Sequence, residues 1–195
     1  MNKQEEIEFF NEVAENWDDK ISQENIEVAR DFINKLEIGN NKSVLDVGAG
    51  TGVLYSILKE KNIKNYLAVD IAEKMIDELL TLHPEVNAKQ FDYETKCTFK
   101  SDFDFVIIFD SIPHFRKLNI VFENSYKNLK KYGKFIIVHS KTREGLKEHH
   151  KKIGYEPDKS PIPSNNKLTS LSKKYGFANI EIKDKEYFRF VCEKR

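Results

Sequence analysis

The chain has 195 residues, of which 39% are hydrophobic and 12% are aromatic, a composition that predicts one folded domain with a short attachment and excludes intrinsic disorder. Its 32 basic and 32 acidic residues balance, so no net field attracts a polyanion, and nucleic acid is disfavoured as a partner. Cys97 and Cys192 form no CxxC pair, and no segment resembles a signal peptide or a membrane span of about 20 apolar residues. We therefore expect a cytoplasmic protein with reduced thiols.

The first part of the chain, residues 3–38, carries two helical patterns and no strand pattern. Ser22 can cap the second helix, whose apolar stripe consists of Ile26, Ala29, Ile33 and Leu36. We expect residues 1–42 to form an N-terminal helical cap on a domain that spans residues 43–195. The aromatic side chains that can close over a cofactor, or simply pack the cap on the core, are Phe9, Phe10 and Trp17.

After residue 42, short apolar runs alternate with helical patterns, which is typical of a parallel sheet with crossover helices. The four clearest runs are Ser43–Val47, Tyr66–Val69, Phe103–Phe109 and Lys134–Val138. Gly133 is expected to end the helix before the last of them in a left-handed conformation. Residues 154–164 predict a loop, and residues 179–193 predict a hairpin.

A glycine-rich turn, Gly48-Ala49-Gly50-Thr51-Gly52, follows the first run, which ends in Asp46 and Val47. Glycines there allow a sharp turn and let a ligand approach the backbone N–H groups. The GxGxxG fingerprint of dinucleotide-binding folds would need glycine where this chain has Val53. The spacing therefore disfavours NAD as the cofactor.

Acidic residues follow the next strands, at the edge of the sheet where open α/β folds bind ligands. Asp70 ends the second strand, where a carboxylate can accept both hydroxyls of a ribose or cap the next helix. Asp92 follows the third strand and can accept a hydrogen bond from an exocyclic amine or lie on the surface. Phe109 and Asp110 follow the fourth strand.

The VLDVGAGTG segment and these acidic strand ends resemble the class I S-adenosylmethionine (SAM)-dependent methyltransferases, specifically the type-11/type-25-like small-molecule group, over residues 43–139. The resemblance implies a Rossmann-like three-layer α/β sandwich with a seven-stranded, mostly parallel sheet and a C-terminal antiparallel strand. It also implies SAM as the cofactor, bound by Asp46, Gly48, Ala49, Gly50, Gly52, Asp70, Ile71, Met75, Phe91, Asp92, Tyr93, Phe109 and Asp110.

Within that resemblance, the three glycines would surround the methionine part of SAM and Asp46 would organise the turn. Asp70 would bind the ribose, Ile71 and Met75 would flank adenine, and Asp92 would meet its amine. The DSIPHF segment after the fourth strand is unlike the Asp/Asn-Pro-Pro-Tyr motif of methyltransferases that modify nucleic-acid bases.

Three histidines are candidates for chemistry: His114 follows the fourth strand, His139 ends the fifth, and His150 lies on a helix that begins near Thr142. We expect them to converge on a pocket that faces the methyl group of SAM. Three roles stay open: buried scaffold residues, one acid–base group that takes a proton from the acceptor, or a divalent metal site helped by Glu144.

The predicted function is methyl transfer from SAM to a small molecule, which yields S-adenosylhomocysteine. A small acceptor is favoured because only the cap, the loop after the fourth strand and residues 140–168 remain to shape its pocket. The alternatives are a SAM-binding protein without catalysis, an NAD-dependent oxidoreductase and an RNA methyltransferase.

Overall fold

The computed structural model describes residues 2–99, 102–152, 154 and 160–195. Residues 155–159 of the predicted loop therefore lie outside the described residues. The α-helices are α1 (Lys3–Val13), α2 (Gln23–Lys35), α3 (Val53–Leu58), α4 (Glu73–Leu82), α5 (Leu118–Asn128), α6 (Arg143–Lys152) and α7 (Asn165–Tyr175). The strands are β1 (Ser43–Val47), β2 (Asn65–Asp70), β3 (Ala88–Gln90), β4 (Phe103–Phe109), β5 (Leu129–His139), β6 (Phe177–Asp184) and β7 (Phe188–Lys194). Short 3-10 helices are η1 (Ala14–Asn16), η2 (Asp18–Lys20), η3 (Lys59–Lys61) and η4 (Ile112–His114).

The described residues form one seven-stranded sheet with the order β3-β2-β1-β4-β5-β7-β6. Strands β1 to β5 pair in parallel, whereas β7 pairs antiparallel with both β5 and β6. This arrangement confirms the predicted Rossmann-like fold. Because β1 and β4 lie side by side at the centre, the winding of the chain reverses between them, and their carboxyl ends open a crevice there.

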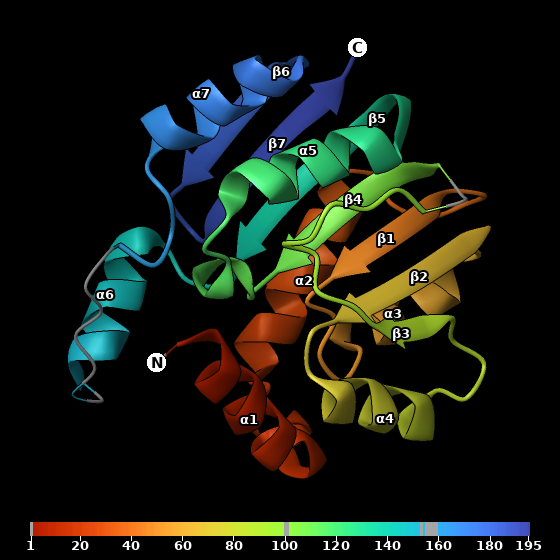
Figure 1. Cartoon of the computed structure of the whole chain (residues 1–195), viewed down its shortest axis with the longest axis vertical. Helices are drawn as coiled ribbons and strands as arrows, with labels where there is room; N and C mark the ends of the chain where they lie inside the picture. The colour runs from red at the N-terminus through yellow and green to blue at the C-terminus, as the bar shows by residue number, and fades with distance from the viewer. Residues whose placement is uncertain (1, 100–101, 153, 155–159) are drawn as a thin grey trace.

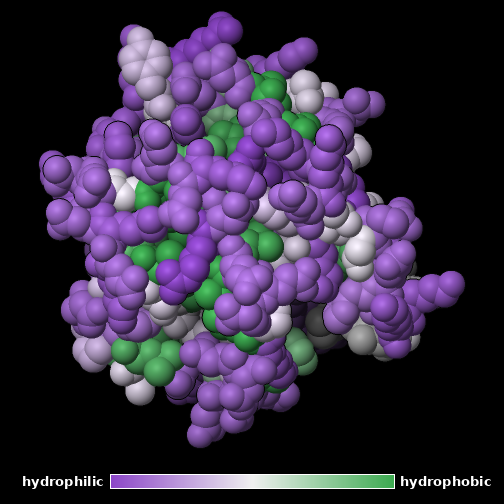
Figure 2. Space-filling model, turned by 180° about the vertical axis from the view of Figure 1, so that it is seen from behind, coloured by the Kyte–Doolittle hydropathy of each residue, from purple (hydrophilic) through white to green (hydrophobic). Residues whose placement is uncertain are grey.

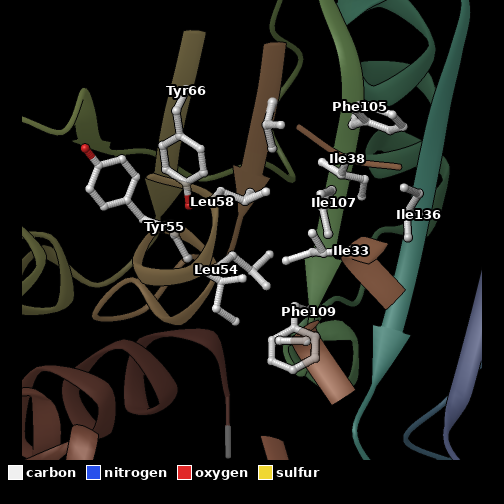
Figure 3. Packing of buried hydrophobic residues seen from close by; sticks show 14 of the residues in the cluster. Ile33, Ile38, Leu54, Tyr55, Leu58, Tyr66, Phe105, Ile107, Phe109 and Ile136 are labelled. Carbon is white, nitrogen blue, oxygen red and sulfur yellow. The ribbon is translucent and has the colours of Figure 1, made fainter. Parts of the chain in front are cut away.

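Helices cover both faces of the sheet, so the inner strands are apolar on both sides (Figure 1). On β4, the side chains of Phe105, Ile107 and Phe109 point to the layer that contains α2 and α3, as Figure 3 shows. Val106 and Ile108 point to the opposite layer, which contains α5 and α7. This double burial explains why the strand is a continuous apolar run instead of an alternating one.

The N-terminal segment divides into two parts. Helix α2 begins after Ser22, whose hydroxyl accepts the Asn25 N–H as predicted, and it buries Phe32 against the sheet, with the ring 5.7 Å from that of Phe109. Helix α1 packs beside α4, below the sheet in Figure 1, and none of its residues, all of them described, is buried. Of the expected N-terminal cap, α2 thus belongs to the core layer, and α1 lies over the carboxyl edge of the sheet.

The expected role of Gly133 is wrong. Helix α5 ends at Asn128, and β5 starts at Leu129, ahead of the predicted run, so Gly133 lies within the strand. A Cβ at Gly133 would lie 2.9 Å from the Lys130 carbonyl oxygen and 3.0 Å from that of Phe103. The glycine is there because two backbone segments approach closely, not because a helix ends. The C-terminal hairpin is confirmed as β6 and β7.

The face seen from behind is mostly hydrophilic, with apolar side chains in small areas between the polar ones (Figure 2). Among the helices of the described residues, none combines the length and apolar character that crossing a membrane would need.

We predict that Phe32→Ala lowers the free energy of unfolding by about 3–5 kcal/mol, because a fully buried aromatic side chain leaves a cavity. Phe9→Ala is the matched control, since Phe9 on α1 is 39% exposed and its removal should cost little. Urea denaturation followed by circular dichroism measures both values. Equal losses in the two variants would contradict the assignment of α2 to the core.

Candidate cofactor site

The glycine-rich turn joins β1 to α3 through left-handed backbone conformations. Gly48, Gly50 and Gly52 have φ values of 73°, 55° and 101°. A Cβ at Gly48 would lie 2.4 Å from the Ser111 hydroxyl oxygen, and one at Gly52 would lie 2.3 Å from a methyl group of Leu79. The left-handed backbone therefore disfavours side chains at all three positions, and at Gly48 and Gly52 a Cβ would also displace Ser111 or Leu79.

Asp70 ties this turn to the end of β2. Its Oδ2 accepts the Gly50 N–H at 2.9 Å and its Oδ1 accepts the Ala72 N–H at 2.9 Å, just before α4. Burial raises the pKa of the Asp70 carboxyl, and these N–H donors only partly offset that effect. Each carboxylate oxygen has two acceptor sites, so Asp70 holds the turn and keeps capacity for further donors.

Asp46 lies beneath the turn. It is fully buried in β1 and accepts the hydroxyl hydrogen of Tyr66 from β2. Burial raises the pKa of Asp46 to about 7; the nearby Asp70 charge adds to the rise and the Tyr66 hydrogen bond opposes it. The partner of the Asp46 carboxylate is thus a side chain of the neighbouring strand, and its role in organising the turn stays a prediction.

A pocket opens at the carboxyl edge of the sheet above this turn. Its wall includes most of the residues that the resemblance implies, namely Gly48, Ala49, Gly50, Asp70, Ile71, Met75, Phe91, Asp92, Tyr93, Phe109 and Asp110. Within the described part of the chain, Asp46 and Gly52 are not on this wall. The N–H groups of Gly48 and Ala49 bond to the Val69 carbonyl, and that of Gly50 bonds to Asp70. The site thus places a tightly held glycine turn next to carboxylates at strand ends, which fits a cofactor with a ribose.

The opposite wall comes from the N-terminal segment. Phe10 of α1 and Trp17 line the pocket, with ring centroids 5.5 Å apart. A Cβ at Gly50 would lie 3.6 Å from the indole nitrogen of Trp17, so the indole covers the glycine turn. The sequence left open whether these aromatic residues face a cofactor or only pack the cap; the structure places both on the pocket wall, whereas Phe9 is partly exposed.

Ion pairs connect α1 to two loops of the pocket, and the sequence patterns did not reveal them. Lys3 Nζ lies 2.8 Å from Asp92 Oδ2 and 3.0 Å from Glu94 Oε2. Glu6 Oε1 lies 2.6 Å from His114 Nδ1, and its Oε2 lies 2.6 Å from Arg116 Nη1. Asp92, which was expected to meet adenine, therefore has Lys3 as its partner here.

Asp110 follows β4 with φ of 52°, an uncommon conformation for a residue with a Cβ. Its carboxylate accepts the Ser140 N–H at 2.6 Å and the Asn25 side-chain N–H at 2.8 Å. Non-glycine residues in this region cost on the order of 1–3 kcal/mol and cluster at functional sites. The two hydrogen bonds hold Asp110 at the pocket wall.

The three histidines are placed differently. His114 lines the pocket, with its ring edge-on to Phe10 at 4.9 Å. His139 is buried behind Asp110, with Nδ1 3.5 Å from Asp110 Oδ1 and 3.0 Å from the Lys141 N–H that it accepts. Burial lowers the pKa of His139 and of His150, and the charge of His114 contributes to both shifts. Of the three histidines, only His114 is among the described residues that line the pocket, so the structure does not bring all three to the pocket wall as expected.

The metal role finds no support in this geometry. In the described ranges, no group of three or more His, Cys, Asp or Glu side chains is arranged to hold a metal ion. His139 turns its Nδ1 to a backbone N–H, which removes that nitrogen from any ligand set.

Comparison with known proteins decides the family. Residues 21–182 match the family described as "Methyltransferase domain". The chain belongs to this methyltransferase family. The NAD-dependent oxidoreductase alternative is thereby set aside, in agreement with the GxGxG spacing.

Relatives of this methyltransferase include a phosphoethanolamine N-methyltransferase 1 from Triticum aestivum, 28% identical over 121 residues that cover 60% of this chain. The chain spans about a quarter of the length of the curated relatives it matches.

Two solved structures share the fold. A TehB-like SAM-dependent methyltransferase from Corynebacterium glutamicum superposes with a TM-score of 0.69 at 14% identity, covering 93% of this chain and 98% of that one. A phosphoethanolamine N-methyltransferase 2 from Haemonchus contortus, solved with phosphomonomethylethanolamine and S-adenosylhomocysteine, gives a TM-score of 0.62 at 18% identity, covering 80% of this chain and 49% of that one.

We predict that Asp46→Asn flattens the pH dependence of stability. Because the folded-state pKa of Asp46 lies near 7, above the ordinary value of 3.8, its contribution to stability is full below the ordinary value and is lost as pH rises through about 7. The free energy of unfolding of the parent should thus fall relative to that of the variant, by at most about 1.4 kcal/mol per pH unit. Urea titrations from pH 4.5 to 8 measure this difference, with the exposed Asp19→Asn as the control. Parallel curves for the parent and Asp46→Asn would refute the expected coupling.

Proposed function

We propose that this methyltransferase binds SAM in the pocket at the sheet edge and transfers its methyl group to a small-molecule acceptor, leaving S-adenosylhomocysteine. The observation that carries the proposal is the hydrogen bond between Asp70 and the Gly50 N–H, which sets a carboxylate beside the glycine turn on the pocket wall. Asp70 would accept the ribose hydroxyls. Ile71 and Met75 would flank the adenine, and Asp92 would receive its amine after parting from Lys3.

SAM supplies a methyl group already activated on a positively charged sulfur, so the protein's main task is to hold the acceptor in line with it. Asp70 and Asp110 place negative charge on the wall, which favours a cationic cofactor. Phe10 and Trp17 shield the pocket from solvent, which strengthens those charge interactions.

The residues that remain to form an acceptor subsite are few, which favours a small acceptor. The wall beyond the glycine turn comes from α1 and from the segment after β4, between Asp110 and Arg116. The relatives from wheat and Haemonchus contortus are named for a small phosphorylated amine, which supports a small acceptor here. His114 is the histidine that lines this part of the wall, and we assign it the acid–base role toward the acceptor.

The test is a screen of small thiols, phenols, amines and metalloid ions for SAM-dependent release of S-adenosylhomocysteine. At least one class should give turnover that His114→Ala reduces by about 10²–10⁴-fold if the acceptor needs proton removal. A chain that binds SAM but methylates none of these classes would favour the alternative of a non-catalytic SAM-binding protein.

Asp70→Ala should weaken SAM binding by about 2–4 kcal/mol, because charge-assisted hydrogen bonds to the ribose are lost. Asp77→Ala on the exposed side of α4 is the control and should bind as the parent does. Calorimetric titration measures the affinities, and thermal melting shows whether loss of the bond to Gly50 has disturbed the fold. If Asp70→Ala melts like the parent and binds SAM equally well, Asp70 serves the backbone alone.

A further inference from the structure

Glu6 of α1 lies between two side chains of the pocket wall that carry nitrogen atoms, those of His114 and Arg116. Its two carboxylate oxygens reach different partners, His114 Nδ1 and Arg116 Nη1, each at 2.6 Å. A planar carboxylate held this way has the contacts that a carboxylate or phosphate group of a bound molecule would make. The contact thus shows that His114 and Arg116 can hold an oxyanion together.

The loop that carries His114 and Arg116 is fixed independently of Glu6. The buried Glu94 accepts the backbone N–H of Arg116 at 2.5 Å and that of Lys117. The backbone N–H of His114 in turn bonds to the Ser111 carbonyl. Departure of Glu6 would therefore leave the backbone of His114 and Arg116 in place. The side chains of His114 and Arg116 are 40% and 41% exposed, whereas that of Glu6 is only 12% exposed, so the two donor groups face the opening and the carboxylate lies within.

The rest of the wall is unsuited to an anion. Asp70, Asp92, Glu94 and Asp110 line it and would repel negative charge. Lys3 is already shared by Asp92 and Glu94. Lys20, the remaining lysine on the described wall, lies 5.5 Å from the ring of Trp17, which covers the glycine turn where the methionine part of SAM would bind. An anionic group on the acceptor thus has its best partners at His114 and Arg116.

The attachment of α1 allows Glu6 to leave. No residue of α1 is buried, and its apolar contacts are those of half-buried side chains such as Phe10 and Val13 around a small cluster with Met75. Burial alone would raise the pKa of Glu6, but the hydrogen bonds and charges of His114 and Arg116 lower it overall, so the carboxylate is ionised when it fills the position. An oxyanion of equal charge can replace it without changing the charge balance.

We infer that His114 and Arg116 form an oxyanion subsite for the methyl acceptor, and that Glu6 is an internal ligand which a phosphate or carboxylate group of the acceptor displaces. The inference rests on the proposed function, because it adds the charge class of the acceptor to that reaction. Only Nδ1 of His114 is needed for the oxyanion, so Nε2 remains for the acid–base role. Exchange of Glu6 for the acceptor would also loosen one end of α1, which couples acceptor binding to the cover of the pocket.

The experiment titrates inorganic phosphate and, separately, acetate into four proteins: the parent, Glu6→Gln, Glu12→Gln, and Glu6→Gln combined with Arg116→Gln. Glu12 is an exposed residue of the same helix and controls for the change in net charge. Side-chain NMR signals of His114 and Arg116 report binding, and the backbone spectrum reports folding. Each titration is run with and without S-adenosylhomocysteine.

Glu6→Gln should bind phosphate or acetate about tenfold more tightly than the parent and Glu12→Gln, and the added Arg116→Gln should abolish the gain. Tighter binding of phosphate alone points to a phosphorylated acceptor, and of acetate alone to a carboxylated one. Equal affinities in Glu6→Gln and Glu12→Gln, or a gain that survives Arg116→Gln, would overturn the subsite. Failure of S-adenosylhomocysteine to bind would instead count against the proposed function. The two failures can be told apart, because the titrations without S-adenosylhomocysteine test the subsite on its own.

Discussion

The pocket depends on the two hydrogen bonds that the Asp70 carboxylate accepts from the backbone. One of its oxygens holds the Gly50 N–H and the other holds the Ala72 N–H, so a single side chain fixes the turn after β1 and the approach to α4. Because the order of the strands reverses at β1 and β4, this joint stands at the centre of the carboxyl edge. The adenosine and methionine parts of the cofactor would meet there.

A second set of charged side chains, less deeply buried, holds helix α1 over the Asp70–Gly50 contact. Helix α1 is attached by Lys3 and Glu6 to two separate loops, by Asn11 to the Lys74 N–H of α4, and by half-buried apolar side chains around Met75. The Lys3–Asp92 pair is partly exposed and contributes only about 0–1 kcal/mol, whereas Glu6 and Glu94 are largely buried. Because no residue of α1 is buried, the helix can move without disturbing the core. In this arrangement Asp70 and the glycine turn stay fixed while α1 can move away from the pocket. Such a movable helix lets a site admit one molecule and release another.

The glycine turn and the acidic strand ends could be predicted because their signals are local. Gly48 and Gly52 are favoured by left-handed backbone conformation and by close neighbours that a Cβ would displace, and Asp70 is the last residue of its strand. Gly133 misled the prediction, since a close backbone approach and a helix end both select glycine.

The contacts of the cover could not be predicted. Lys3 and Glu6 meet partners far along the chain, in loops whose positions depend on the finished sheet. The histidines show the same limit: strand ends placed His114 and His139 in one region, but whether each side chain faces the pocket or the interior depends on packing that no spacing reveals.

The central claim is that the glycine turn and Asp70 form a SAM site. The most direct measurement is calorimetric titration of the purified chain with S-adenosylhomocysteine and, in parallel, with NAD. The account predicts saturable binding of S-adenosylhomocysteine with one site per chain and no binding of NAD. Binding of NAD without binding of S-adenosylhomocysteine would contradict it.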